Sequence, residues 1–454
     1  METLQDICRP GDISPALFDT LALKTYYDAN AAELIPDPSL APDFASWSQL
    51  SIDEAREQND STRKLMSNGN KSPGCQVYCE RRAELSIPNE DAFHTVRRLP
   101  AKKGRKQPRL GNSYEFFRCL ELLTPYWDDT SAPPKPAENA ENAAPEPSPA
   151  EGDASADKET DEPDEYYRTM TGTAMPPEQR HGLLSAFIKL VAYDFGCNIT
   201  APRSEPRLNL CAPPTKQRGA RKSYVPSGCI FVFRTPTERQ QARSGIIEGP
   251  LAAVSARGTT SFEDPIEKNQ DLAREVLASL VAAQHRGREG KTEKRFGEGE
   301  WWTTKPRWGG GRGGPIGREI EADEVVGDKD ASSPPTKKPR KTIAAYDNYR
   351  MIRPPSLAWD RKTKYEAIGK VPGAEVDDIF VLSSLFHHIS ILRVRVPKRL
   401  LDVLEGRKDE DPGELVLWRS KWFDFFVTED RIEAMELLWG VFAYQTRPKP
   451  EQGS

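Results

Sequence analysis

The chain has 454 residues, of which 37% are hydrophobic and 29% charged, and its formal net charge is −5. The length predicts two or three domains, and the negative charge excludes a protein that coats DNA through overall basicity. No secretory signal is recognised, and no run of about 18 apolar residues predicts a membrane span, so no membrane contact is expected. Seven cysteines, an odd number scattered along the chain, indicate reduced thiols and an intracellular protein.

The first region, residues 1–127, gives mixed signals. Apolar side chains recur at helical spacing in residues 15–32 and again in residues 113–123. Between them, residues 77–87 fit a strand as well as a short helix. Residues 128–165 then alternate Asp and Glu with Pro, Ala and Ser and contain no large hydrophobic side chain. Such a segment buries too little apolar area to offset its ordering entropy, which predicts a disordered acidic linker.

Residues 166–320 are predicted to form a central α+β domain with a basic tail rich in Trp and Gly. Residues 176–194 follow the apolar period of an amphipathic helix. Thr235 begins a capping box for a short helix, and Asp264 caps a longer one. The segments that read as strands are residues 207–211, 229–233 and 251–255. This order of elements predicts a small, mostly antiparallel sheet with helices.

A second disordered linker is predicted at residues 321–342, and a helical domain at residues 343–446. Four amphipathic helices are expected in that domain, the first capped by Asp377, the second opened by Pro397 and the last entered from Thr428. The third is expected at residues 415–426. Short connections between four such helices predict a bundle. The expected fold class is therefore α+β, with a C-terminal helical bundle and disordered linkers.

The most specific short pattern is a basic cluster in the second linker, residues 335–341. Its cations are Lys337, Lys338, Arg340 and Lys341. The cluster resembles a monopartite nuclear localisation signal, which implies a nuclear import receptor as a partner and a nuclear protein that also occurs in the cytoplasm. The alternative is a solvated linker that is merely rich in lysine. Residues 102–106 form a second, shorter basic cluster, which is another candidate for such a signal, with a solvated loop as the alternative.

Tryptophans and cations alternate within residues 285–318. The side chains concerned are Trp301, Trp302, Lys305, Arg307, Trp308 and Arg312. Cations neutralise phosphates and flat rings stack on bases, so this composition is typical of single-stranded nucleic-acid binding. Two alternatives stay open, namely a lid packed on the central domain and a contact surface for another protein.

Two groups of side chains in the sequence are of the types that bind metals. The first consists of Cys75, Cys79, His94 and Cys119, whose spacing is irregular for zinc. The second is the pair His387 and His388. On the helix predicted there, adjacent side chains point about 100° apart, so they are not expected to converge on one ion. Neither a metal nor a cofactor is expected.

The sequence contains no recognisable catalytic motif. The interpretation that it favours is a non-enzymatic nuclear adaptor or regulatory protein that assembles other proteins, with nucleic acid as a possible platform. The first alternative is direct binding of RNA or single-stranded DNA through residues 285–318. The second alternative is an enzyme whose site the sequence does not reveal.

Overall fold

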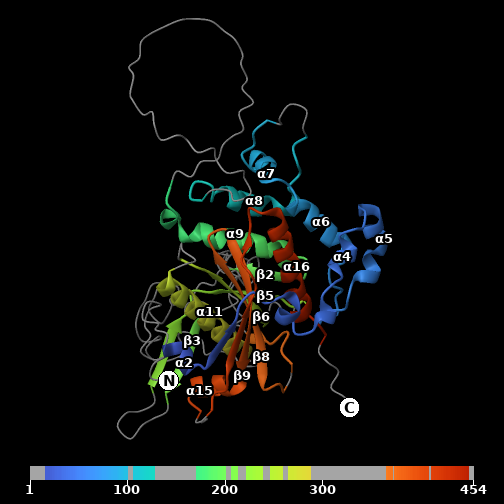
Figure 1. The fold of residues 1–454 in the computed structure, drawn as a ribbon. Coiled ribbons are helices and arrows are strands. Elements are labelled where there is room, and N and C mark those ends of the chain that lie inside the picture. The colour runs from blue at the N-terminus through green and yellow to red at the C-terminus, as the bar shows by residue number, and fades with distance from the viewer. Residues whose placement is uncertain are drawn as a thin grey trace, which may run out of the picture.

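A computed structural model gives the architecture of the chain. It describes residues 16–100, 106–127, 170–200, 206–212, 221–238, 246–258, 264–287, 364–371, 373–407 and 411–448. These residues form helices on both faces of one large central sheet (Figure 1).

The central sheet has nine strands in the order β1-β10-β9-β8-β6-β5-β2, with β7 beside β6 and β11 beside β9. The strands are β1 (Leu23–Tyr26), β2 (Cys197–Thr200), β5 (Ile230–Arg234), β6 (Ile246–Ala256), β7 (Lys364–Glu366), β8 (Val376–Leu385), β9 (His388–Pro397), β10 (Leu415–Arg419) and β11 (Phe423–Asp424). A separate two-stranded sheet pairs β3 (Arg207–Ala212) with β4 (Arg221–Pro226). The early, middle and late parts of the chain thus share one sheet.

Most neighbouring strands are antiparallel, and three pairs are parallel: β1 with β10, β6 with β7 and β6 with β8. Since β9 runs against both β8 and β10, the strands β1, β6, β8 and β10 all point the same way. Their carboxyl ends therefore lie at one end of the sheet, which we call the carboxyl edge. Ligand sites of α/β sheets gather at such an edge.

Each face of the sheet has its own core. One face is covered by α11 (Pro265–Arg286) together with α2 (Ala16–Thr20), α15 (Lys398–Leu404) and the β3–β4 pair. The other face carries α9 (Pro177–Ala192) and α16 (Thr428–Gln445). Outside these lie α3 (Ala31–Leu34), α4 (Phe44–Trp47), α5 (Ile52–Thr62), α6 (Cys75–Leu85), α7 (Asn89–Val96) and α8 (Tyr114–Glu121). Short 3₁₀ helices occupy Pro38–Leu40, Gly111–Ser113 and Gly172–Ala174.

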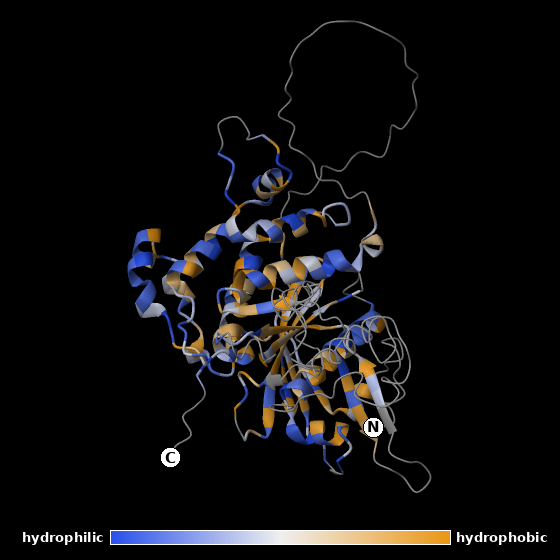
Figure 2. Ribbon diagram, turned by 180° about the vertical axis from the view of Figure 1, so that it is seen from behind, coloured by the Kyte–Doolittle hydropathy of each residue, from blue (hydrophilic) through white to orange (hydrophobic). Residues whose placement is uncertain are grey.

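The hydropathy of the strands explains their position. Figure 2 shows apolar strands at the centre and helices that alternate between apolar and polar residues around them. In β9, for example, nearly every residue is buried, because side chains on both faces of the strand meet a helical layer. The helix α11 begins as predicted: the Asp264 side chain accepts hydrogen bonds from the backbone N–H groups of Ile266 and Glu267, and Pro265 follows it.

The structure confirms a mixture of helices and a mostly antiparallel sheet, but it corrects the expected size of that sheet, which is large. The expected C-terminal bundle is wrong. The helix predicted from Asp377 is the β8–β9 hairpin, and residues 415–426 contain β10 and β11. The helices predicted after Pro397 and from Thr428 are confirmed as α15 and α16. Strands that are buried on both faces have continuous runs of apolar residues, and such runs also place apolar residues at the spacing of a buried helix. The apolar pattern alone therefore does not distinguish these strands from helices.

The predictions for the N-terminal region are confirmed only in part, and those for the linkers stay predictions. Residues 77–87 fall mainly in the helix α6, and residues 113–123 contain α8, as predicted. Residues 15–32 do not form one helix, because the strand β1 separates α2 from α3. The predicted linkers, and most of the short helix after Thr235, lie outside the described residues. Among the described helices, none is both long and apolar enough to span a bilayer.

Candidate functional site

The side chains singled out in the sequence are only partly within the described structure. Those outside it are Trp301, Trp302, Lys305, Arg307, Trp308, Arg312, Lys337, Lys338, Arg340 and Lys341. The start of the basic aromatic segment is described, and it is buried: Arg286 lies at the end of α11, with its Nη2 atom 3.2 Å from Oδ1 of Asp377. Arg286 is thus part of the core, and a nucleic-acid contact would have to begin after it.

The structure places the members of the cysteine group on three different helices. Cys75 and Cys79 lie on α6, His94 on α7 and Cys119 on α8, and no ligand-type geometry joins them within the described residues. All six described cysteines are free thiols. Burial raises the pKa of the Cys119 thiol to about 11, with a further rise from the nearby Glu115 carboxylate. Such a thiol is a poor nucleophile and a poor ligand at neutral pH, because the thiolate is the reactive form.

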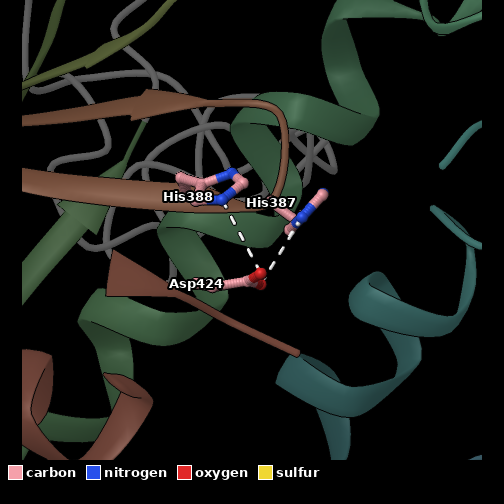
Figure 3. Close-up of side chains that lie close together, drawn as sticks. All are labelled: His387, His388 and Asp424. Carbon is pink, nitrogen blue, oxygen red and sulfur yellow. Dashed lines mark ion pairs between the residues drawn. The ribbon is translucent and has the colours of Figure 1, made fainter. Parts of the chain in front are cut away.

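The two adjacent histidines converge with an aspartate at the carboxyl edge (Figure 3). His387 lies in the turn between β8 and β9, His388 is the first residue of β9, and Asp424 pairs with His388 from β11. The Nε2 atom of His387 is 3.5 Å from Oδ1 of Asp424, and that of His388 is 3.6 Å from Oδ2. The expectation that the two histidines diverge is wrong, because it assumed a helix where the chain makes a tight turn.

This histidine cluster, defined as His387, His388 and Asp424, is enclosed by aromatic rings. The His387 ring lies 4.7 Å from the ring of Phe426 and 6.3 Å from that of Trp127, measured between centroids. The two imidazole rings are 4.2 Å apart. Burial and the neighbouring His387 lower the pKa of His388 to about 4, which outweighs the opposite effect of Asp424. The imidazole of His388 is therefore neutral at physiological pH.

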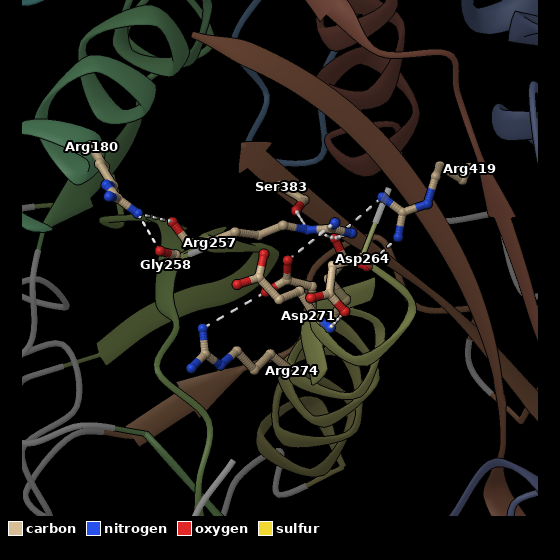
Figure 4. Close-up of polar contacts among 10 residues, drawn as sticks. Arg180, Arg257, Gly258, Asp264, Asp271, Arg274, Ser383 and Arg419 are labelled. Carbon is tan, nitrogen blue, oxygen red and sulfur yellow. Dashed lines mark hydrogen bonds and ion pairs between the residues drawn. The ribbon is translucent and has the colours of Figure 1, made fainter. Parts of the chain in front are cut away.

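A second polar group at the carboxyl edge is a buried ion cluster, made of Arg257, Asp271, Glu275 and Arg419 (Figure 4). Arg257 follows β6, Arg419 ends β10, and the two carboxylates project from α11. Glu275 joins the arginines: its Oε1 atom accepts hydrogen bonds from Nη2 of Arg257 at 2.6 Å and Nη1 of Arg419 at 3.3 Å, and its Oε2 atom pairs with Nη2 of Arg419. Asp271 pairs with Arg257 at 3.4 Å.

The surroundings of the ion cluster hold its arginines in place. Nε of Arg257 donates to the Ser383 hydroxyl at 3.3 Å, and the Trp422 ring lies 4.8 Å from the Arg257 guanidinium and 5.3 Å from that of Arg419. Burial alone would raise the pKa of Glu275, but the charges of Arg257 and Arg419 outweigh burial and lower it to about 2. The buried carboxylates of Asp271 and Glu275 thus pair with Arg257 and Arg419 and, at 3.8 Å from Asp271, with the partly exposed Arg274, an arrangement that positions the ends of β6 and β10.

A third feature is an aromatic surface beside the edge strand β1, which we call the β1 edge patch and define as Tyr26 of β1, the following Tyr27, Arg395 of β9 and Trp418 of β10. Tyr26 and Tyr27 are 51% and 62% exposed. The ring of Tyr26 stacks on that of Trp418 at 5.8 Å, and the guanidinium of Arg395 lies 5.3 Å from the Trp418 ring. On its outer side β1 pairs with no strand among the residues that the structure describes.

Two adjoining cavities lie at the far end of β6 from the carboxyl edge. One, of about 290 Å³, is mostly apolar and includes Trp47, Phe195 and Trp439 in its wall. The other, of about 140 Å³, has a wall of mixed polar and apolar character that includes Arg234, Lys370 and Ile368. None of the residues that line either cavity belongs to the histidine cluster or the ion cluster. The cavities are therefore separate from both.

Comparison with known proteins gives no relative: no family model, no curated protein and no solved structure matches this chain.

Proposed function

We propose that this chain is a non-enzymatic nuclear adaptor that assembles other proteins, and that the β1 edge patch is one of its contact surfaces. The observation that carries the proposal is the composition of this patch. Tyrosine, tryptophan and arginine are the residues enriched in protein interfaces and their hot spots. Here Tyr26 on β1 stacks on the partly buried Trp418 of β10 beside Arg395 of β9, and the outer edge of β1 has no strand beside it in the described structure.

The partner that fits this surface is an extended segment of another protein. Such a segment adds a strand to the free edge of β1 through backbone hydrogen bonds, and its side chains then contact the tyrosines. Arg395 favours a partner with an acidic side chain, although Asp378, 3.4 Å from its Nε atom, balances part of this charge. The ion pair of Lys24 with Glu414, at 2.8 Å, adds no net charge to the same edge. The binding free energy of such a partner is therefore expected to come mainly from aromatic rings and backbone hydrogen bonds, and less from charge.

Affinity purification of the tagged full-length protein from its own cells, with and without nuclease, tests the proposal. We expect a defined set of proteins that survives nuclease treatment. The double variant Tyr26→Ser/Tyr27→Ser should reduce their recovery about tenfold, the effect of losing roughly 1.4 kcal/mol of binding free energy. Tyr193→Ser is the matched control, because Tyr193 is equally exposed but lies at the end of α9.

The outcomes separate the two candidate functions. If the Tyr26→Ser/Tyr27→Ser variant recovers as much partner protein as the Tyr193→Ser control, the β1 edge patch is not a contact surface. Loss of all partners on nuclease treatment would instead favour direct binding of RNA or single-stranded DNA, for which the basic and aromatic residues 288–318 are the sequence support. Thermal unfolding of each variant shows whether the substitutions act on the surface or on folding.

The basic cluster at residues 335–341 is proposed to direct nuclear import. Replacing Lys337, Lys338, Arg340 and Lys341 by alanine should abolish the nuclear enrichment of a fluorescently tagged copy, because an import receptor binds such cations in an acidic groove. A separate variant replaces the basic residues of the shorter cluster at 102–106, the second candidate signal, for comparison. An unchanged nuclear-to-cytoplasmic ratio in the first variant would contradict this assignment.

A further inference from the structure

The histidine cluster has the spacing of ligands around a metal ion. Within the described residues, His387, His388 and Asp424 are the one group of three His, Cys, Asp or Glu side chains whose ligand atoms gather, all within 4.8 Å of one another. Ligands placed tetrahedrally at about 2.1 Å from a zinc ion stand about 3.4 Å apart. The observed separations of 3.5 and 3.6 Å between the imidazole nitrogens and the carboxylate oxygens agree with that value and are long for hydrogen bonds.

His387 has unused bonding capacity. Both of its ring nitrogens are buried, and neither has a hydrogen-bond partner among the described residues. Buried polar atoms without partners are rare in folded proteins, because each one carries the cost of leaving water. The aromatic rings that surround His387 offer no acceptor, and the nearest carboxylate oxygen lies 3.5 Å away. An ion between His387 and Asp424 would satisfy the imidazole.

The ligands are held in position by the backbone around them. The carboxylate of Asp424 accepts a hydrogen bond from the backbone N–H of Phe426 at 2.8 Å. The backbone N–H of Phe425 donates to the carbonyl of His387 at 2.9 Å, which ties the turn to the segment after β11. Such outer contacts orient ligands before the ion arrives, as in established metal sites. The turn itself is strained, since Phe386 has φ 53°.

The charges around the cluster also favour a cation. Asp424 supplies one negative charge directly. Asp430 lies next to it, because its Oδ2 atom accepts a hydrogen bond from the backbone N–H of Asp424 at 2.9 Å. Lys421, which pairs with Asp430 at 3.1 Å, also pairs with Glu433 at 2.7 Å. The side chain of His388 is 19% exposed, so solvent reaches the edge of the cluster.

We propose that His387, His388 and Asp424 bind one divalent transition-metal ion, with zinc as the first choice. Two imidazole nitrogens and one carboxylate oxygen form the protein part of the site, and the fourth position is taken by water or by an atom of a partner. The same three ligand types also suit ferrous iron, so the test compares the two ions. The site does not depend on the adaptor function, because it lies at the carboxyl edge and not on β1.

The test uses the purified full-length protein after treatment with a chelator. Titration with Zn²⁺ against a chromophoric indicator should give one tight site per chain, and Fe²⁺ under anaerobic conditions gives the comparison. His388→Gln and Asp424→Asn should each weaken binding by about 100-fold or more, since even the loss of an outer contact costs about 10–100-fold. His94→Gln is the matched control, because His94 lies on α7, outside the cluster.

Cobalt(II) provides a readout that does not depend on variants. In the wild-type protein, Co²⁺ should give visible absorption bands of a nitrogen and oxygen site without the near-ultraviolet band of a thiolate ligand. A thiolate band would assign the metal to the free cysteines and overturn the proposal. The same holds if Zn²⁺ binds the wild type and both cluster variants equally, or if the wild type binds neither ion. Circular dichroism confirms that each variant is folded before its affinity is compared.

Discussion

The Glu275→Gln variant is expected to lose about 3–5 kcal/mol of its free energy of unfolding, the typical cost of breaking a buried ion pair by removing one partner. Glutamine keeps the shape of the side chain but not its charge. Arg257 and Arg419 would then lose the one carboxylate that pairs with both of them, and Asp271 is already shared between Arg257 and Arg274. The strand ends that the two arginines join, after β6 and β10, would lose their common contact.

Urea unfolding followed by circular dichroism measures this loss. Glu57→Gln is the matched control, because Glu57 is exposed on α5, and it should change the free energy of unfolding by less than about 0.5 kcal/mol. A loss below about 1 kcal/mol for Glu275→Gln would show that the cluster tolerates an uncompensated arginine. Water entering the site would be the physical explanation for such a result.

The same carboxylate has a consequence for pH. The folded-state pKa of Glu275 is lowered from 4.5 to about 2, so the unfolded chain binds its proton more readily than the folded one. Its contribution to stability is therefore fully present above pH 4.5 and is lost as the pH falls toward 2. Between these limits the wild type should lose stability more steeply than Glu275→Gln, as measured by urea unfolding at a series of pH values.

The second large effect is expected at Arg431, a fully buried residue of α16. Its guanidinium donates at 2.6 Å to three acceptors: the carbonyls of Leu85 and Ile87 and the side chain of Asn89. Arg431→Met fills similar space but leaves these acceptors without their donor. We expect a loss of about 3–5 kcal/mol, because buried acceptors that lose a charged donor carry their full desolvation cost.

Limited proteolysis and urea unfolding measure the effect of Arg431→Met. Cleavage should accelerate around residues 85–89, where the connection between α6 and α7 is tied to the last helix. Arg56→Met, on the exposed surface of α5, is the control and should leave both measurements close to the wild type. Normal stability with faster cleavage would mean that Arg431 fixes only this local connection and not the fold.

The sequence predicted helices with one apolar side better than it predicted strands. The helices α9, α11 and α16 were recognisable because their apolar residues recur at helical spacing and α11 has a capping aspartate. The strands β8 and β9 were not, since helices cover both faces of the sheet and nearly all of their residues are buried. The β-branched residues in them, such as Ile379 and Val394, were the signal that would have distinguished strand from helix.

The polar clusters were harder to predict, because their members are distant in the sequence. Glu275 and Arg419 are 144 residues apart, and only the order of the strands brings β10 close to α11. A local signal did exist: Asp271 and Glu275 lie one helical turn apart, directly before the almost wholly apolar residues 276–283 of the same helix, and buried carboxylates need cations. His387 and His388 gave no such signal, since their convergence depends on a turn that was taken for a helix.

The pairing of β1 with β10 determines when the sheet can be completed during synthesis. Lys24 and Glu414, which face each other across this pair, are 390 positions apart in the chain. At about 5–20 residues per second, a ribosome needs roughly 20–80 seconds to make the residues between them. During that time the newly made β1, with Tyr26 at its end and Tyr27 directly after it, has no strand to pair with. A chaperone that binds short aromatic segments would meet this strand first, before any partner of the finished protein.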